Sequence, residues 1–150
     1  MLDVVAVALV DPNRRVLLQR RRADRHHGGL WEFPGGKLEP NETAVVGLLR
    51  EVWEELGLQL EKTDIQLLAR AEDSAEGVVI SLYICWTWIG EPQCLDAAEL
   101  HWFEPDELTA LAMPPLDVPL AQALQTALKS PISGLPRRSA ARMCAIPTRP

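Results

Sequence analysis

The chain has 150 residues, of which 47% are hydrophobic and 24% charged, a composition typical of one globular domain and not of a disordered or fibrous protein. Its formal net charge of −6, from 15 basic and 21 acidic residues, argues against a protein that binds nucleic acid polymers through a basic face. We expect no membrane span or signal peptide, because the apolar run at residues 4–10 is short and follows Asp3, and three cysteines without C-x-x-C spacing suit a reducing cytoplasm.

The first part of the chain predicts two strands and a loop. Residues 3–10 predict a largely buried strand, because almost no polar residue alternates along them. After a turn at residues 11–13, residues 16–20 predict a second strand that forms a hairpin with the first. Residues 21–41 contain two glycine pairs and two prolines, and they predict a loop.

The strongest predicted helix covers residues 43–56 and ends at Gly57, which is expected to serve as a C-terminal cap. At about 100° per residue, one side of this helix forms an apolar stripe of Val45, Leu49, Val52 and Leu56. Glu51, Glu54 and Glu55 fall on the opposite side, where three carboxylates repel one another. Such a face is either a solvated acidic surface or, beside a glycine-rich loop, a set of hard oxygen ligands that suits Mg²⁺.

The second part of the chain predicts further strands at residues 65–72, 78–89 and 100–103, then a short helix at 105–111 and a terminal helix at 120–129. Because strands precede and follow the long helix, the predicted class is α/β with a mixed sheet. The tryptophans of the later strands, Trp86, Trp88 and Trp102, are interpreted as core residues.

The charge is unevenly distributed along the chain. Residues 130–150 contain four prolines and four arginines but no acid, which predicts a flexible basic tail after one domain of residues 1–129. Without that tail, 11 basic and 21 acidic residues remain, a net charge of −10. Such an excess of acidic residues suggests that some of the carboxylates have a function.

One spaced motif supplies such a function, namely Gly36-x5-Glu42-x7-Arg50-Glu51-Val52-x-Glu54-Glu55-x-Gly57-Leu58. This motif resembles the complete Nudix box. The sequence also resembles the MutT branch of nucleoside triphosphate pyrophosphatases. This resemblance rests on residues 30–37 (LWEFPGGK), on Arg20-Arg21, and on Gly90-Glu91-Pro92 followed by Trp102. The resemblance covers residues 3–128 and implies a three-layer α/β/α Nudix fold with a mixed sheet.

The resemblance also implies an activity, the hydrolysis of a nucleoside triphosphate with Mg²⁺ as cofactor and Mn²⁺ as an alternative. Water attacks the β-phosphorus and releases a nucleoside monophosphate and pyrophosphate, which sanitises or balances the nucleotide pool. The expected partner is a small nucleotide, with neither a nucleic acid polymer nor a membrane, and the expected assembly is a monomer or a homodimer.

The family's metal ligands carry over onto Glu51, Glu54, Glu55 and the backbone carbonyl of Gly35. Arg50 and Glu42 carry over as a pair that orients these carboxylates. Asp96 matches the MutT-like general base or additional ligand from a later loop, and Glu99 is a rival for that role. Whether Glu51 or Asp96 is the general base stays open, because both are expected near the metal.

Substrate binding is expected from Arg21 and Lys37, which would bind the phosphates, and from Phe33, an aromatic residue that could stack on the base. Asp117 has two interpretations. One is the N-cap of the last helix, and the other, which capping does not exclude, is a residue that contacts the base, since Asp117 stands where the MutT branch has an Asn that reads oxidised guanine.

The chemistry of Asp117 bears on the base. An ionised Asp only accepts hydrogen bonds and so matches the exocyclic amine of cytosine or adenine, whereas an Asn can match 8-oxoguanine. A protonated Asp can donate, which keeps oxidised purines within reach. The prediction is therefore a hydrolase of cytosine nucleotides or of modified nucleotides such as 8-oxo-dGTP, with the preference shifted towards an amine-bearing base.

Two alternatives belong to other classes. One is a Nudix hydrolase of ADP-ribose or a dinucleoside polyphosphate, which usually has further motifs or a longer chain. The other is a non-catalytic domain that senses nucleotides, which usually has lost one of the metal carboxylates. All of these carboxylates are present here, and this favours the enzyme.

Overall fold

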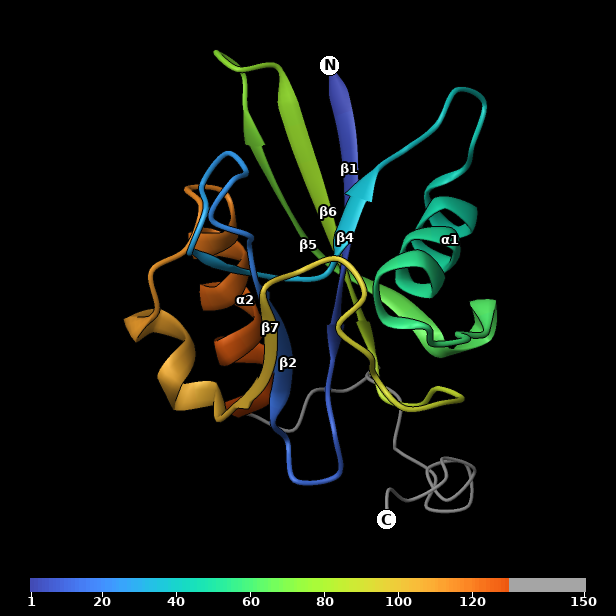
Figure 1. The fold of residues 1–150 in the computed structure, drawn as a ribbon, viewed down its shortest axis with the longest axis vertical. Coiled ribbons are helices and arrows are strands. Elements are labelled where there is room, and N and C mark those ends of the chain that lie inside the picture. Colours follow the sequence, from blue (N-terminus) through green and yellow to red (C-terminus); the bar gives the residue numbers. More distant parts are fainter. Residues whose placement is uncertain (130–150) are drawn as a thin grey trace.

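The computed structural model describes residues 1–129, and the predicted tail at 130–150 lies outside the described residues. Its elements are β1 (Leu2–Leu9), β2 (Val16–Arg20), β3 (Trp31–Glu32), β4 (Gly35–Lys37), α1 (Ala44–Leu56), η1 (Lys62–Asp64), β5 (Ile65–Asp73), β6 (Val78–Cys85), β7 (Glu99–Phe103), η2 (Pro105–Ala110) and α2 (Asp117–Lys129). Helices α1 and α2 lie on opposite sides of the strands (Figure 1). The predicted α/β/α arrangement is thereby confirmed.

The strands form two sheets, one in the order β4-β1-β6-β5 and one in the order β3-β2-β7. The larger sheet is mixed, because β1 runs parallel to β6 while its other pairs are antiparallel. The predicted hairpin of the first two strands is wrong, since they share only the bridge between Val10 and Val16. The carboxylate of Asp11 accepts from the backbone N–H groups of Asn13 and Arg15, and the turn that it stabilises directs β2 to β3 and β7.

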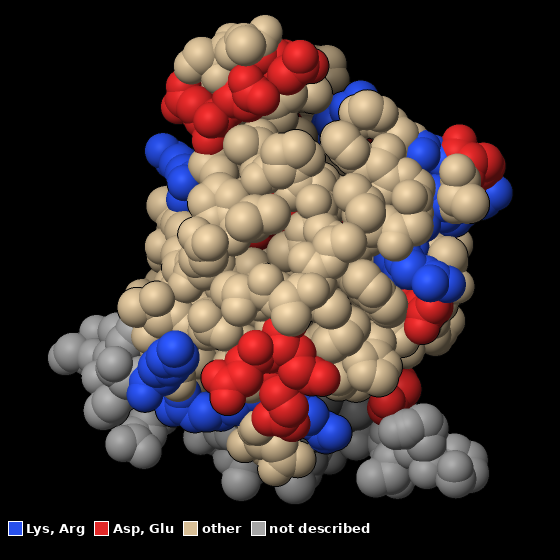
Figure 2. All heavy atoms as spheres, turned by 90° about the vertical axis from the view of Figure 1, so that its left-hand side faces the viewer, with Lys and Arg blue, Asp and Glu red and all other residues tan. Residues whose placement is uncertain are grey.

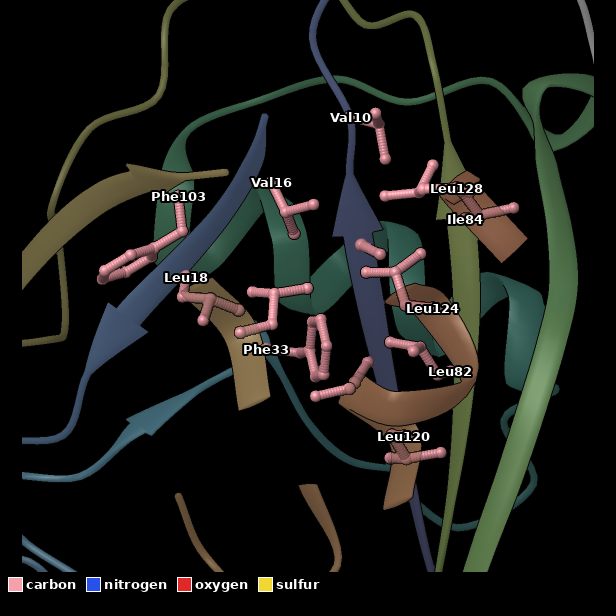
Figure 3. Packing of buried hydrophobic residues seen from close by; sticks show 14 of the residues in the cluster. Val10, Val16, Leu18, Phe33, Leu82, Ile84, Phe103, Leu120, Leu124 and Leu128 are labelled. Carbon is pink, nitrogen blue, oxygen red and sulfur yellow. The ribbon is translucent and has the colours of Figure 1, made fainter. Parts of the chain in front are cut away.

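Strand β1 contributes to two hydrophobic layers, as its nearly continuous apolar sequence predicts. Its odd-numbered residues, Val5, Val7 and Leu9, pack with Leu48, Val52 and Leu56 of α1. The even-numbered Ala6 and Ala8 belong to the layer that faces α2. Figure 3 shows that layer, in which Leu120, Leu124 and Leu128 lie over Leu82 and Ile84. Each buried leucine in such a layer stabilises the fold by about 1.5–3 kcal/mol.

Helix α1 has the ends that its sequence predicts. The hydroxyl of Thr43 accepts from the backbone N–H of Val46 at 3.3 Å, and Gly57 ends the helix with a φ of 68°. The buried stripe is displaced from the predicted one, because Val45 and Leu49 are only partly buried. The buried residues of the helix are Gly47, Leu48, Val52 and Leu56.

Other boundaries differ from the prediction in ways that matter for the site. The predicted strand at 78–89 ends at Cys85, whose carbonyl accepts from the backbone N–H of Val10 just after β1, yet Trp86 and Trp88 are buried as expected. The predicted loop at 21–41 contains the short strands β3 and β4. The terminal helix begins earlier, at Asp117. Within residues 1–129 no helix has the length and apolar character needed to cross a membrane.

Candidate active site

A pocket of about 800 Å³ opens between residues 4–6 of β1, strand β4, helix α1 and loop residues 21–27, 96–97 and 114–116. Three kinds of side chain line it. Acidic groups come from Glu32, Glu51, Glu55, Asp73, Glu76, Asp96 and Asp117, basic groups from Arg21, Arg22, Arg25 and Lys37, and apolar groups from residues such as Val4, Ala6, Phe33, Val78 and Ile80. The pocket therefore offers carboxylates for cations, basic groups for phosphates and apolar surface for a ring.

Glu51 lies directly over Gly36 of β4. A Cβ atom at Gly36 would stand 2.4 Å from the Glu51 carboxylate, so a side chain at this position of β4 would displace that carboxylate. Burial raises the pKa of Glu51, against the opposing effect of the Arg50 guanidinium. Strand β4 passes directly beneath the Glu51 carboxylate. The first glycine of the box leaves room for this close approach.

Glu55 is the most enclosed carboxyl group of α1. Its Oε1 atom accepts from the backbone N–H of Gly35 at 3.0 Å and from Nε2 of Gln19 at 3.3 Å. Burial, and then the nearby carboxylates of Glu51 and Glu32, raise the pKa of Glu55 to about 8. The predicted solvated face is thus wrong for Glu55, which points into the pocket.

Arg50 holds the acidic residues of the box together. Its guanidinium donates to both carboxylate oxygens of Glu42, at 2.7 and 2.9 Å, and to the backbone carbonyl of Lys37 at 3.1 Å. It also donates to Glu51 at 3.0 Å and Glu54 at 3.1 Å. The hydrogen bonds from Arg50 lower the pKa of Glu42 to about 2. The predicted pairing of Arg50 with Glu42 is present.

The donor atoms of the pocket decide whether it can bind a metal ion. Within residues 1–129 no three acidic, histidine or cysteine side chains gather closely enough to hold a metal as they stand, and Glu54 lies outside the pocket with its side chain 53% exposed. The carboxylates of Glu51 and Glu55 and the carbonyl of Gly35 are nevertheless the hard oxygen donors that Mg²⁺ prefers. A buried carboxyl with a pKa of about 8 needs either a proton or a cation, and these residues fit a divalent ion.

On the basic side, Arg21 is held by Glu32 at 2.9 Å and by the backbone carbonyl of His26 at 2.6 Å. Lys37 is exposed at the rim. Asp96 lines the pocket and faces Arg25 at 3.5 Å. Its rival Glu99 instead pairs with Arg20 at 2.7 Å and does not line the pocket.

Asp117 lines the pocket and is 7% exposed. Its Oδ2 atom accepts from the backbone N–H of Phe33 at 3.1 Å, across 84 positions of sequence. Burial raises the pKa of Asp117 to about 7. The ring of Phe33 is 3% exposed and packs among the buried residues of the core (Figure 3).

Two polar residues that contact each other in this pocket were not predicted from the sequence. Gln19 stands in β2 and Glu32 in β3, and the amide of Gln19 donates to Glu32 at 3.1 Å. The sequence contained a signal for Gln19, because it is a polar residue in the otherwise apolar part of a buried strand. Glu32 gave none, since it lies in a segment that the glycines and prolines mark only as a loop.

Comparison with known proteins identifies the family. The family model of the NUDIX domain matches residues 1–124. The CTP pyrophosphohydrolase of Escherichia coli (strain K12) is 36% identical over 126 residues, which cover 82% of this chain and 90% of that protein. The 8-oxo-dGTP diphosphatase of Proteus vulgaris is 33% identical over 90 residues, which cover 60% of this chain and 80% of that protein.

Among solved structures, the solution structure of the E. coli ORF135 protein superposes with a TM-score of 0.75 at 31% sequence identity, covering 87% of this chain and 91% of that chain. The match to the family extends well beyond the box, over both sheets and most of α2. The chain therefore belongs to the Nudix hydrolase family, as a MutT-like pyrophosphohydrolase.

Proposed function

We propose that this Nudix hydrolase is a Mg²⁺-dependent nucleoside triphosphate pyrophosphatase with a preference for cytosine nucleotides, including modified ones. It converts a triphosphate and water into a monophosphate and pyrophosphate. Nudix hydrolases generally use divalent metal ions, typically Mg²⁺. By this reaction the enzyme would sanitise or balance the cytoplasmic pool of nucleotides.

The proposed metal ligands are the carboxylates of Glu51, Glu54, Glu55 and Asp96 and the carbonyl of Gly35. Bound Mg²⁺ would neutralise phosphate charge and make a water molecule more acidic. Arg50 is itself held by Glu42 and keeps Glu51 in place. It would release Glu54 when that carboxylate binds the metal. The proton of the attacking water goes to Glu51 or Asp96, both of which line the pocket.

The basic side of the pocket would bind the triphosphate. Arg21 is held in a fixed position by Glu32 and the carbonyl of His26, so its guanidinium loses little freedom when it binds an anion. Lys37 at the rim adds a second positive group. The net charge of −10 on residues 1–129 is compatible with an anionic substrate, because the proposed metal ion and these basic side chains would both face the phosphates.

The position of Asp117 is the observation that carries the choice of base. One of its oxygens is occupied by the N–H of Phe33, and the residue lines the pocket. In the ionised form, the remaining oxygen accepts from an exocyclic amine such as N4 of cytosine. The E. coli relative that is 36% identical carries the name CTP pyrophosphohydrolase, which supports the same choice.

The second candidate substrate is 8-oxo-dGTP, and the protonation of Asp117 favours it. With a pKa of about 7, the residue is partly protonated near neutral pH. Because Oδ2 already accepts from Phe33, the proton belongs on the other oxygen, which then donates to a carbonyl such as O6 of an oxidised guanine.

A nucleotide panel tests the proposal. CTP, 5-substituted dCTPs, 8-oxo-dGTP and 2-hydroxy-dATP are incubated with the full chain and MgCl2, and released pyrophosphate and phosphate are both measured. We expect pyrophosphate, with the highest kcat/KM for a cytosine nucleotide. A preference for 8-oxo-dGTP that Asp117→Ala abolishes and Asp117→Asn keeps would contradict the ionised acceptor. Phosphate as the product would contradict the proposed bond cleavage.

A further inference from the structure

Gln19 is a polar side chain placed in the interior, with only 2% of its surface exposed. Its neighbours in β2, Leu17 and Leu18, are fully buried core residues. The amide nitrogen of Gln19 donates to Oε2 of Glu32 at 3.1 Å and to Oε1 of Glu55 at 3.3 Å. One amide group thus bridges two carboxylates that come from β3 and α1.

The orientation of this amide is fixed by its partners. A glutamine amide has two N–H donors, and here one points to each carboxylate. The reverse orientation would place the carbonyl oxygen against two acceptors. In the observed orientation Oε1 of Gln19 is buried and has no hydrogen-bond partner among the described residues. A buried acceptor without a partner destabilises a fold, so packing alone would favour an apolar residue in β2.

The two bonds hold two different carboxylates of the pocket. Oε1 of Glu55 is held jointly by Gln19 and the backbone N–H of Gly35, and neither bond uses Oε2 of Glu55. Glu32 uses its second oxygen to hold Arg21 at 2.9 Å. A continuous chain of hydrogen bonds therefore joins the proposed metal ligand Glu55 to the proposed phosphate-binding residue Arg21.

We propose that Gln19 is a positioning residue that fixes Glu55 for metal binding and, through Glu32, fixes Arg21 on the substrate side. The proposal rests on the proposed function in one respect, namely that Glu55 is a metal ligand. Groups that hold metal ligands in place typically contribute a factor of about 10–100 to metal affinity or activity. Gln19 does not itself contact the metal or the reacting atoms.

The substitution Gln19→Met tests this role, because methionine keeps the length of the side chain and removes the donors. We expect Mg²⁺ affinity, measured by titration calorimetry with MgCl2 on the full chain, to fall by about tenfold or more. With CTP as substrate, kcat should fall more than KM rises. The unfolding temperature of the metal-free protein should stay close to that of the wild type, since the orphan acceptor is lost together with the two hydrogen bonds.

Gln125→Met is the matched control, because the amide of Gln125 donates to the carbonyl of Pro105 at 2.8 Å and lies outside the pocket. It should leave Mg²⁺ affinity and kcat unchanged. Gln19→Leu, which repeats the residue type of Leu17 and Leu18, is a second variant with the same expected result. Wild-type Mg²⁺ affinity in both Gln19 variants, or an equal loss in Gln125→Met, would overturn the proposal.

Failure of the proposed function would look different. If the wild type released pyrophosphate from none of the nucleotides, the proposed reaction would be wrong. The Mg²⁺ titrations of the wild type and Gln19→Met would still decide whether Gln19 positions a metal ligand.

Discussion

Asp117 meets two requirements that oppose each other. Its carboxylate must accept from the N–H of Phe33, and it must do so in a buried position that raises its pKa to about 7. The unfolded chain exposes the same group, whose ordinary pKa is 3.8. Protons are therefore bound more tightly by the folded state, and stability is lost as pH rises from about 4 to about 7.

Asp117→Asn removes this loss, because an amide oxygen can still accept from Phe33 and has no charge to bury. We expect the gain in unfolding free energy over the wild type to be larger at pH 8 than at pH 5, by about 2–3 kcal/mol. Urea denaturation at the two pH values measures it. Asp106→Asn, an exposed acid of η2, is the control, and parallel pH curves for Asp117→Asn and the wild type would contradict the prediction.

The residues of the site could be predicted to different extents. Glu51 and Glu55 were predictable because the helical period places them on one side and the box motif gives them a common role. Glu32 and the bridge by Gln19 were not, because their contacts join β2, β3 and α1 and depend on how the sheets pack. Local spacing contains no information about such a meeting of three elements.

At the scale of elements, the segment before α1 is tied to the helix by an ion pair. Glu42 precedes the helix, and its side chain, 10% exposed, pairs with Arg50 two turns into it. Hydrogen bonds from Arg50 lower the pKa of Glu42 to about 2, from an ordinary value of 4.5. The contribution of this pair to stability is present above about pH 4.5 and is lost as pH falls towards 2.

Glu42→Gln should therefore lower the unfolding temperature at pH 7, and the difference from the wild type should shrink towards zero at about pH 2. Thermal unfolding followed by circular dichroism between pH 2 and pH 7 measures this. Glu61→Gln removes an exposed acid outside the box and serves as the reference. A difference that stayed constant over the whole pH range would show that Glu42 does not act through its charge.

Elements were predictable where their signals are local. Thr43 and Gly57 mark the ends of α1 in the sequence, and both ends are where they were expected. The partner of β2 was not predictable in the same way, because a hairpin with β1 is the local solution whereas β7 lies far along the chain. The short strands β3 and β4 exist only through pairing with β2 and β1.

At the scale of the whole molecule, charge is absent from much of one side. Figure 2 shows the side of α2, whose middle is largely free of charged side chains while acidic and basic groups lie around it. In the sequence of α2 only Asp117 and Lys129 are charged, and Asp117 is buried. The acidic excess of the domain is therefore carried elsewhere, and part of it lines the pocket.

The domain proposed to end at residue 129 should function without the residues that follow. Helix α2 extends to Lys129, and Arg14 donates to the carbonyl of Leu128 at 2.6 Å, so the last turn is closed by a residue of the domain itself. We expect a chain of residues 1–129 to keep kcat and KM within about twofold of the full chain, since independent parts act additively. A loss of most of the activity would give residues 130–150 a catalytic role.

The parallel pairing of β1 with β6 has a consequence for how the protein is made. Strand β1 pairs with β4 only at residues 4–6, whereas it pairs with β6 along residues 2–9, and residues 78–85 of β6 are synthesised long after β1. At a synthesis rate of about 5–20 residues per second, this apolar, β-prone segment stays without its pairing to β6 for several seconds. Such segments are prone to aggregate while unpaired, so chaperone supply during translation, rather than final stability, should limit the yield of this enzyme.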